Sequence, residues 1–160
     1  MKYKMTLEEV KNRALDLMHH GNDCGPSVMQ VMCETSGFDQ ELFWAGFPLY
    51  GGIAGQQRAT CGAVAASAVY LGLRHRMSLT DKEAVARERK IIEKEANGLA
   101  GEFIKKFDTT ICLELVKLDL SIPENWKKYE EENITARTCD LFVNFVLEKL
   151  YEIEEMRENK

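Results

Sequence analysis

The feature that most constrains this chain is the segment RATCGAVAASAVYLGLRHR, residues 58–76. From Ala63 to Leu73 nearly every residue is small or apolar, and these residues go right round a helix predicted from about Thr60 to Leu73. A helix that is apolar on every side must be buried among other elements, and its small alanines let neighbouring helices come close. We therefore predict an all-α fold, a single-domain helical bundle (1–160) around this small-residue central helix.

Helix-start signals predict further helices on both sides of this segment. Thr6 with Glu9, and Thr80 with Glu83, have the spacing of capping boxes, which satisfy free backbone N–H groups at helix starts. The stretch SIPENWKKYEEEN (121–133) is expected to be a polar connection. No alternation of apolar and polar residues typical of strands is present, which supports the all-α prediction.

Composition limits the classes of function. The 160 residues are 45% hydrophobic and 29% charged, which is an ordinary globular balance, and the net charge of −5 argues against a nucleic-acid binder. The N-terminal sequence MKYKMTLEEVKNR is polar and shows no signal peptide. The apolar run 63–73 is shorter than the roughly 20 residues that a membrane span needs. We expect a soluble, cytoplasmic protein with no nucleic-acid or membrane partner.

Four of the five cysteines share one predicted setting, close to the start of a helix. These are Cys24, Cys61, Cys112 and Cys139. A helix start carries unpaired N–H groups and a partial positive charge, and both favour thiolate over thiol. A thiolate attacks disulfides and also ligates metals, so these four are the candidate redox or metal residues. Cys33 falls in the middle of the second predicted helix, in VMQVMC, and is expected to be a core residue.

The spacing of the cysteines excludes several familiar sites. Without secretion signals, the cysteines are not expected to form a structural disulfide set. No C-x-x-C pair is present, so neither a zinc ribbon nor a thioredoxin-like motif is indicated. No C-x-x-C-H is present, so we expect no covalent haem. His20 lies close to Cys24 in the sequence, which leaves a mixed Cys/His metal site open.

Several pieces of the chain together resemble a known family. They are NDCGPSVMQVM, the glycine-rich loop from Gly46 to Gly55, TCGAVAASAVYLGLRH, TTICLEL and TARTCDLFVNFVLEKL. In this order they resemble the redox-active family named for the C_GCAxxG_C_C cysteine pattern, over roughly Leu7 to Leu150. The resemblance implies that the family's four cysteines correspond to Cys24, Cys61, Cys112 and Cys139. The chain departs from the pattern at Ala66, where the family motif has glycine, and at Gly25-Pro26, where members often have alanine after the cysteine.

Three functions stay open at this point. The first is a metal centre held by the four cysteines, with an iron–sulfur cluster leading, which would serve electron transfer or redox sensing with an unknown redox partner. The second is a metal-free thiol–disulfide redox protein. The third is a non-catalytic helical scaffold or ligand-binding module whose cysteines only pack. Small-residue helices and the apolar loop also allow a homodimer.

Overall fold

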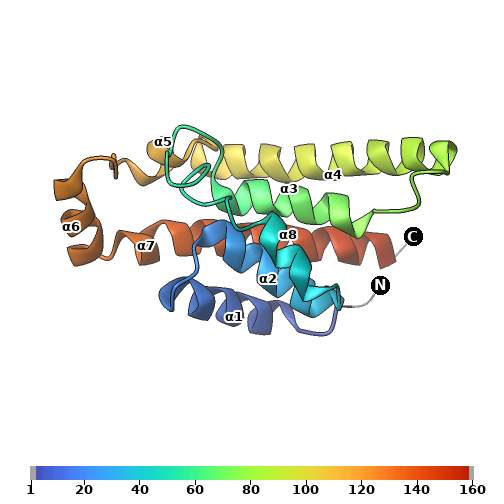
Figure 1. Ribbon diagram of the computed structural model, residues 1–160, viewed down its shortest axis with the longest axis horizontal. Coiled ribbons are helices and arrows are strands. Elements are labelled where there is room, and N and C mark those ends of the chain that lie inside the picture. Colours follow the sequence, from blue (N-terminus) through green and yellow to red (C-terminus); the bar gives the residue numbers. More distant parts are fainter. Residues whose placement is uncertain (1–2, 159–160) are drawn as a thin grey trace.

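The computed structural model describes residues 3–158 of the chain and is all-α (Figure 1). In chain order, the elements are α1 (Leu7–His19), α2 (Cys24–Ser36), the 3₁₀ helix η1 (Gln40–Ala45), α3 (Gly62–Arg74), α4 (Lys82–Phe107), α5 (Cys112–Val116), α6 (Pro123–Glu131), α7 (Ile134–Arg137) and α8 (Cys139–Glu158). Over residues 3–158 there is no strand, only an isolated antiparallel bridge between Thr60 and Ile111. The all-α prediction is confirmed.

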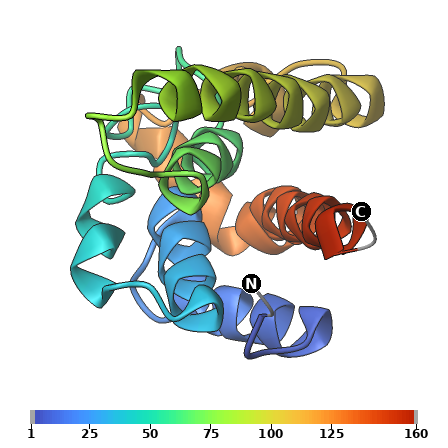
Figure 2. The same ribbon diagram turned by 90° about the vertical axis from the view of Figure 1, so that its right-hand side faces the viewer.

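Helix α3 packs against α2, α4 and α8, and Figures 1 and 2 show it lying along α4 and beside α2. Its buried side, which includes Ala66, Tyr70 and Leu71, contributes to the main core. The expectation that α3 is buried on all sides is wrong, because Ala68 is exposed. An alanine at this position exposes only one methyl group, so the open side of the helix costs little hydrophobic free energy.

One predicted capping box is present and the other is not. Thr6 and Glu9 exchange reciprocal hydrogen bonds at the start of α1, as expected. At α4 the expected cap was Thr80, but the observed cap is Asp81, whose carboxylate accepts a hydrogen bond from the N–H of Ala84 at 2.9 Å. Aspartate competes well for this position because its charge also interacts favourably with the helix dipole.

The stretch 121–133 is a helix over most of its length, so its prediction as a polar connection is wrong. Pro123 occupies the first position of α6, where its fixed φ suits helix initiation and its missing N–H costs nothing. No residue of α6 is buried, which explains why hydrophobic periodicity did not reveal it. In Figure 1, α5, α6, α7 and the loop before α3 gather at the left-hand end of the molecule.

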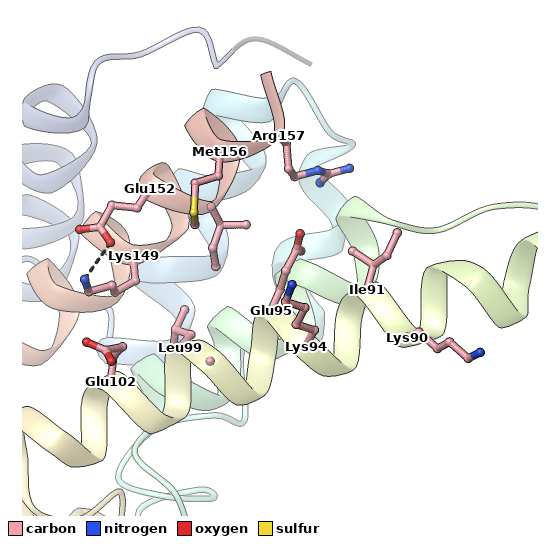
Figure 3. A pocket seen from close by; sticks show the side chains of 12 residues that line it. Lys90, Ile91, Lys94, Glu95, Leu99, Glu102, Lys149, Glu152, Met156 and Arg157 are labelled. Carbon is pink, nitrogen blue, oxygen red and sulfur yellow. Dashed lines mark hydrogen bonds and ion pairs between the residues drawn. The ribbon is translucent and has the colours of Figure 1, made fainter. Parts of the chain in front are cut away.

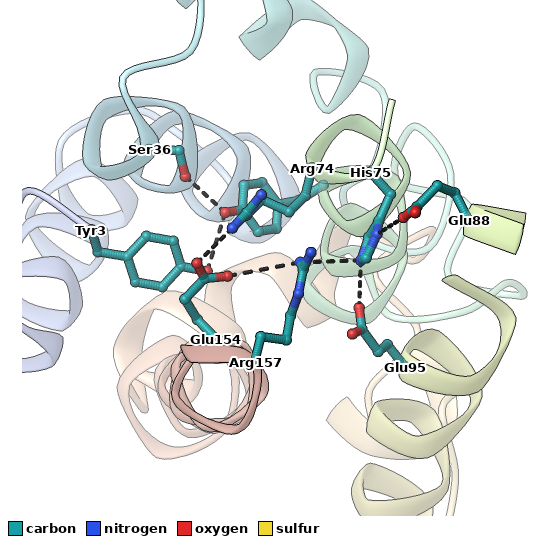
Figure 4. A network of polar contacts seen from close by, with 9 residues as sticks. Tyr3, Ser36, Arg74, His75, Glu88, Glu95, Glu154 and Arg157 are labelled. Carbon is teal, nitrogen blue, oxygen red and sulfur yellow. Dashed lines mark hydrogen bonds and ion pairs between the residues drawn. The ribbon is translucent and has the colours of Figure 1, made fainter. Parts of the chain in front are cut away.

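A buried polar network lies at the C-terminal end of α3, the end away from Cys61 (Figure 4). The Arg74 guanidinium is 2.5 Å from a carboxylate oxygen of Glu154, and both side chains are almost fully buried. The His75 side chain is fully buried, with one ring nitrogen 2.7 Å from Glu88 and the other 2.7 Å from Glu95. These contacts tie the end of α3 to α4 and to α8.

Helices α4 and α8 also enclose a groove of about 880 Å³ (Figure 3). Its lining mixes apolar side chains such as Leu99, Ile153 and Met156 with charged ones such as Lys94 and Glu152. None of the cysteines lines it. Of the helices described over residues 3–158, none combines the length and the apolar character needed to cross a membrane.

Candidate functional site

The four candidate cysteines lie at helix starts, as predicted. Cys24 is the first residue of α2, Cys112 the first of α5 and Cys139 the first of α8, while Cys61 is the residue that caps α3. Cys33 lies in the middle of α2 and is completely buried in the main core, which confirms its assignment as a core residue.

All four helix-start cysteines line one cavity of about 240 Å³. The rest of the lining is contributed by Met18, Asn22, Asp23, Tyr50, Gly51, Gly55, Gln57, Leu115, Val116, Leu120, Trp126, Tyr129, Thr135 and Phe142. Cys61 and Cys112 are buried, whereas Cys24 and Cys139 are partly exposed. The fold therefore brings together four thiols from distant parts of the sequence, and their redox or metal role stays a prediction.

Backbone pairing sets Cys61 beside Cys112. The N–H of Cys61 donates to the carbonyl of Thr110 at 2.6 Å, and the N–H of Cys112 donates to the carbonyl of Ala59 at 3.1 Å. These bonds flank the isolated bridge and join the chain entering α3 to the chain entering α5. Two helix starts are thereby fixed next to each other without a regular sheet.

Glycine after Cys24 and after Cys61 lets the starts of α2 and α3 both pack closely against the loop residue Leu49. A Cβ atom added to Gly25 would lie 1.8 Å from the Leu49 carbonyl oxygen, and one added to Gly62 would lie 2.0 Å from the same oxygen. The Cβ on Gly62 would also lie 2.8 Å from the sulfur of Cys24. Only a residue without a side chain fits at either position, so the Cys-Gly pairs are a packing requirement of the cavity.

Cys24 and Cys61 both line the cavity, and each changes the pKa of the other. The pKa of Cys24 is lowered, first by the Cys61 thiol and then by N–H donors from Gly51 and Gly25, which outweigh burial. The pKa of Cys61 is raised well above 9.0, first by Cys24 and then because burial disfavours a second thiolate. Ionisation of the pair is therefore easier at Cys24 than at Cys61.

Burial dominates at the other two thiols. It raises the pKa of Cys112 to about 12 and that of Cys139 to about 11, in each case aided by the negative charge on Cys24. The expectation that a helix start favours thiolate at all four cysteines is therefore wrong for Cys61, Cys112 and Cys139. The free-energy cost of desolvating a thiolate in this cavity exceeds the stabilisation that the few N–H and O–H donors provide.

Two lining residues were not identified from the sequence. Gln57 is buried in a left-handed conformation (φ 57°) and its side chain bonds the carbonyl of Leu118 at 3.0 Å and the N–H of Leu120 at 2.7 Å. Its side chain also partly opposes the rise in the pKa of Cys112. The hydroxyl of Tyr129 lies 3.6 Å from the sulfur of Cys139. Neither residue belongs to a periodic pattern, although two aromatic residues in the charged stretch WKKY (126–129) were an available signal.

The structure also bears on the metal alternatives. In the described part of the chain, no three His, Cys, Asp or Glu side chains are arranged so that they could hold a metal ion. His20 does not line the cavity, because its ring turns outward and bonds the carbonyl of Asp16 at 2.8 Å. The mixed Cys/His site therefore has no support from this geometry.

Comparison with known proteins gives one family match. The family described as "Putative redox-active protein (C_GCAxxG_C_C)" matches residues 22–153, a range that contains all four cavity cysteines. Searches of curated proteins and of solved structures find no match.

Proposed function

Because the chain belongs to the C_GCAxxG_C_C family of redox-active proteins, we propose that it is a thiol–disulfide redox protein whose working pair is Cys24 and Cys61. The single observation that supports this most is that the Cys24 sulfur lies against Gly62, the residue after Cys61, where an added Cβ atom would come within 2.8 Å of it. Both thiols line the same cavity, so we expect them to form a disulfide with each other. The glycines that follow both cysteines keep the two helix starts close.

Cys24 is the attacking residue of the pair. Its pKa is lowered, so more of it is thiolate at neutral pH than of an ordinary cysteine, and it is partly exposed whereas Cys61 is buried. Cys61 is the resolving residue, because its pKa is raised and it is buried. This division of roles follows from exposure and charge together.

The reaction is an exchange with a substrate disulfide, R–S–S–R′. The Cys24 thiolate attacks one substrate sulfur, forms a mixed disulfide and releases the other half as the thiolate R′–S⁻. Cys61 then attacks the Cys24 sulfur, which forms the Cys24–Cys61 disulfide and releases R–S⁻. The Cys61 proton passes to one of the released thiolates, so the protein pair loses two electrons and the substrate disulfide gains them.

The test is exposure of the reduced protein to oxidised glutathione, followed by thiol counting and disulfide mapping. The chain has five cysteines, and we expect three free thiols (5 − 2) after oxidation with a mapped Cys24–Cys61 bond. Cys61→Ser should accumulate a glutathione adduct at Cys24, because no resolving thiol follows. Cys33→Ser is the matched control and should still form the bond. Five free thiols after oxidation would instead favour cysteines that only pack in a scaffold or ligand-binding module.

A second candidate is an iron–sulfur cluster, which one observation favours. All four thiols line the same cavity, and four thiolates are the usual ligand set of such clusters. A cluster distributes its ligands over several iron atoms, so its cysteines need not surround one ion. Cys24, Cys61, Cys112 and Cys139 would hold it, and N–H groups at the helix starts would offset its negative charge. When bound, a cluster would supply one-electron transfer.

Cys112 and Cys139 separate the two candidates. A cluster requires them as ligands, whereas the disulfide pair does not use them. Protein purified without oxygen is assayed for iron, sulfide and visible absorbance, alongside Cys112→Ser and Cys139→Ser. Metal content that disappears in both variants supports the cluster. A Cys24–Cys61 disulfide that forms equally well in both variants, in metal-free protein, supports thiol exchange.

The remaining expectations follow from the thiol chemistry. Free thiols persist in a reducing compartment, so we expect the protein to act in the cytoplasm. Its redox partner would be a molecule that carries a disulfide or dithiol. A homodimer also stays a prediction, which sedimentation would test. The groove between α4 and α8, where Met156 is well exposed, is the surface to mutate in that test.

A further inference from the structure

Helix α6 lines the cysteine cavity and has no buried residue, although Tyr129 packs against the small core cluster of Cys112, Val116 and Ile134. Trp126 and Tyr129 of α6 line the cavity and stack edge to face, with ring centroids 5.7 Å apart. No residue of α6 is buried, and Trp126 remains 49% exposed. A helix with so little buried apolar surface is held in place by few contacts, and each contact therefore matters for its position.

The contact that links α6 to the cavity is a hydrogen bond to a thiol. The Thr135 hydroxyl donates to the Tyr129 hydroxyl at 2.9 Å, which leaves the Tyr129 hydrogen free to donate to the Cys139 sulfur at 3.6 Å. Thr138 lies 3.7 Å from the same sulfur, but its single hydrogen is directed to the carbonyl of Ile134 at 2.7 Å. Tyr129 is therefore the main donor to Cys139.

Both ends of the α6 segment are fixed to buried parts of the protein. Before the helix, the buried side chain of Gln57 hydrogen-bonds the backbone of Leu118 and Leu120, which fixes this end of the segment. After the helix, Asn133 adopts a left-handed conformation with φ 47°, and the next residue, Ile134, is buried. Within residues 3–158, Tyr129 is also the one α6 residue with a hydrogen bond to the chain outside 118–133.

We propose that α6 is a lid on the cysteine cavity and that the Tyr129–Cys139 hydrogen bond is its latch. With the latch closed, Trp126 and Tyr129 cover the thiols and admit only small reagents. With the latch broken, α6 moves away from the cavity between its two fixed ends and exposes Cys24 to bulky disulfides, such as those in proteins. The consequence for substrates rests on the proposed function, whereas the motion of the lid does not.

The test uses Trp44→Phe protein, in which Trp126 is the single remaining tryptophan of the two. Tyr129→Phe removes only the latch hydroxyl, and Tyr50→Phe is the matched control because Tyr50 lines the same cavity. Loss of one hydrogen bond should increase the open population about fivefold. We expect alkylation of Cys24 by a bulky maleimide to accelerate by that factor, and acrylamide quenching of Trp126 to increase. Tyr50→Phe should leave both unchanged.

A second variant keeps the proposal testable if Tyr129→Phe folds poorly. Cys139→Ala removes the acceptor of the same bond, so it should accelerate Cys24 alkylation equally, and adding Tyr129→Phe should have no further effect. Equal alkylation and quenching in Tyr129→Phe, Cys139→Ala and the control would overturn the lid. These readouts need no redox turnover, so failure of the Cys24–Cys61 disulfide test leaves them interpretable.

Discussion

The sulfur of Cys24 lies against Gly62, so closely that a Cβ atom at this position would come within 2.8 Å of it. The same Cβ would lie 2.0 Å from the carbonyl oxygen of Leu49, which is backbone and cannot rotate away. Gly62, the residue after Cys61, therefore limits where the side chain of Cys24 can lie. Cys24 and Cys61 are coupled through packing as well as through their effects on each other's pKa.

Gly62→Ala should destabilise the protein and displace Cys24. Overpacking against a flexible side chain costs about 1–3 kcal/mol, and a backbone carbonyl yields less readily, so we expect a loss of about 3 kcal/mol. The free energy of unfolding from denaturant titration measures the loss. Gly98→Ala is the control, because a Cβ there has no neighbour within 4 Å. Alanine in a helix interior should stabilise by about 0.5–1 kcal/mol. Equal stability of the two variants would contradict the packing argument.

Replacing Cys61 should raise the pKa of Cys24. The Cys61 thiol is the largest cause of the lowered pKa, and without it burial and the nearby Asp23 carboxylate act with less opposition. In Cys61→Ala we therefore expect the alkylation rate of Cys24 to rise at higher pH than in the wild type. The pH dependence of iodoacetamide labelling, followed by mass spectrometry, measures the shift. Cys33→Ala, which changes a core thiol outside the cavity, should leave the Cys24 profile in place.

The sequence predicted the helical class and the helix-start positions of the four cysteines, because both depend on local patterns. It did not predict that burial would override the helix-start effect at Cys112 and Cys139, since desolvation depends on what covers a residue. Part of this cover comes from Tyr129 of α6, a helix with no buried residue. Likewise, Gln57 hydrogen-bonds Leu118 and Leu120, which are distant in the sequence, and the residues next to Gln57 in the chain do not predict these contacts.

The protein should lose stability at high pH partly through Cys139. Its folded pKa of about 11 exceeds the ordinary value of 9.0, so above pH 9 the unfolded chain loses a proton that the folded protein keeps. Stability therefore falls as the pH rises from about 9 to about 11, by roughly 1–3 kcal/mol from this group. Denaturant titrations at several pH values measure it. Because buried tyrosines titrate in both proteins, the difference between wild type and Cys139→Ser is the informative quantity, and it should shrink with rising pH. A constant difference from pH 8 to pH 11 would count against this assignment.

The buried Arg74–Glu154 pair should contribute far more to stability than a surface pair of the same kind. The two side chains are 10% and 6% exposed, so Glu154→Leu leaves a buried guanidinium without its carboxylate, at a cost of about 3–5 kcal/mol. Adding Arg74→Met should recover part of this loss, because the unpaired charge is removed. Arg89 and Glu93 are 78% and 60% exposed, and removing either should change stability by less than about 1 kcal/mol. Double-mutant cycles on both pairs, from denaturant unfolding, measure the two coupling energies. Similar coupling energies would mean that Arg74 and Glu154 are better solvated than their burial implies.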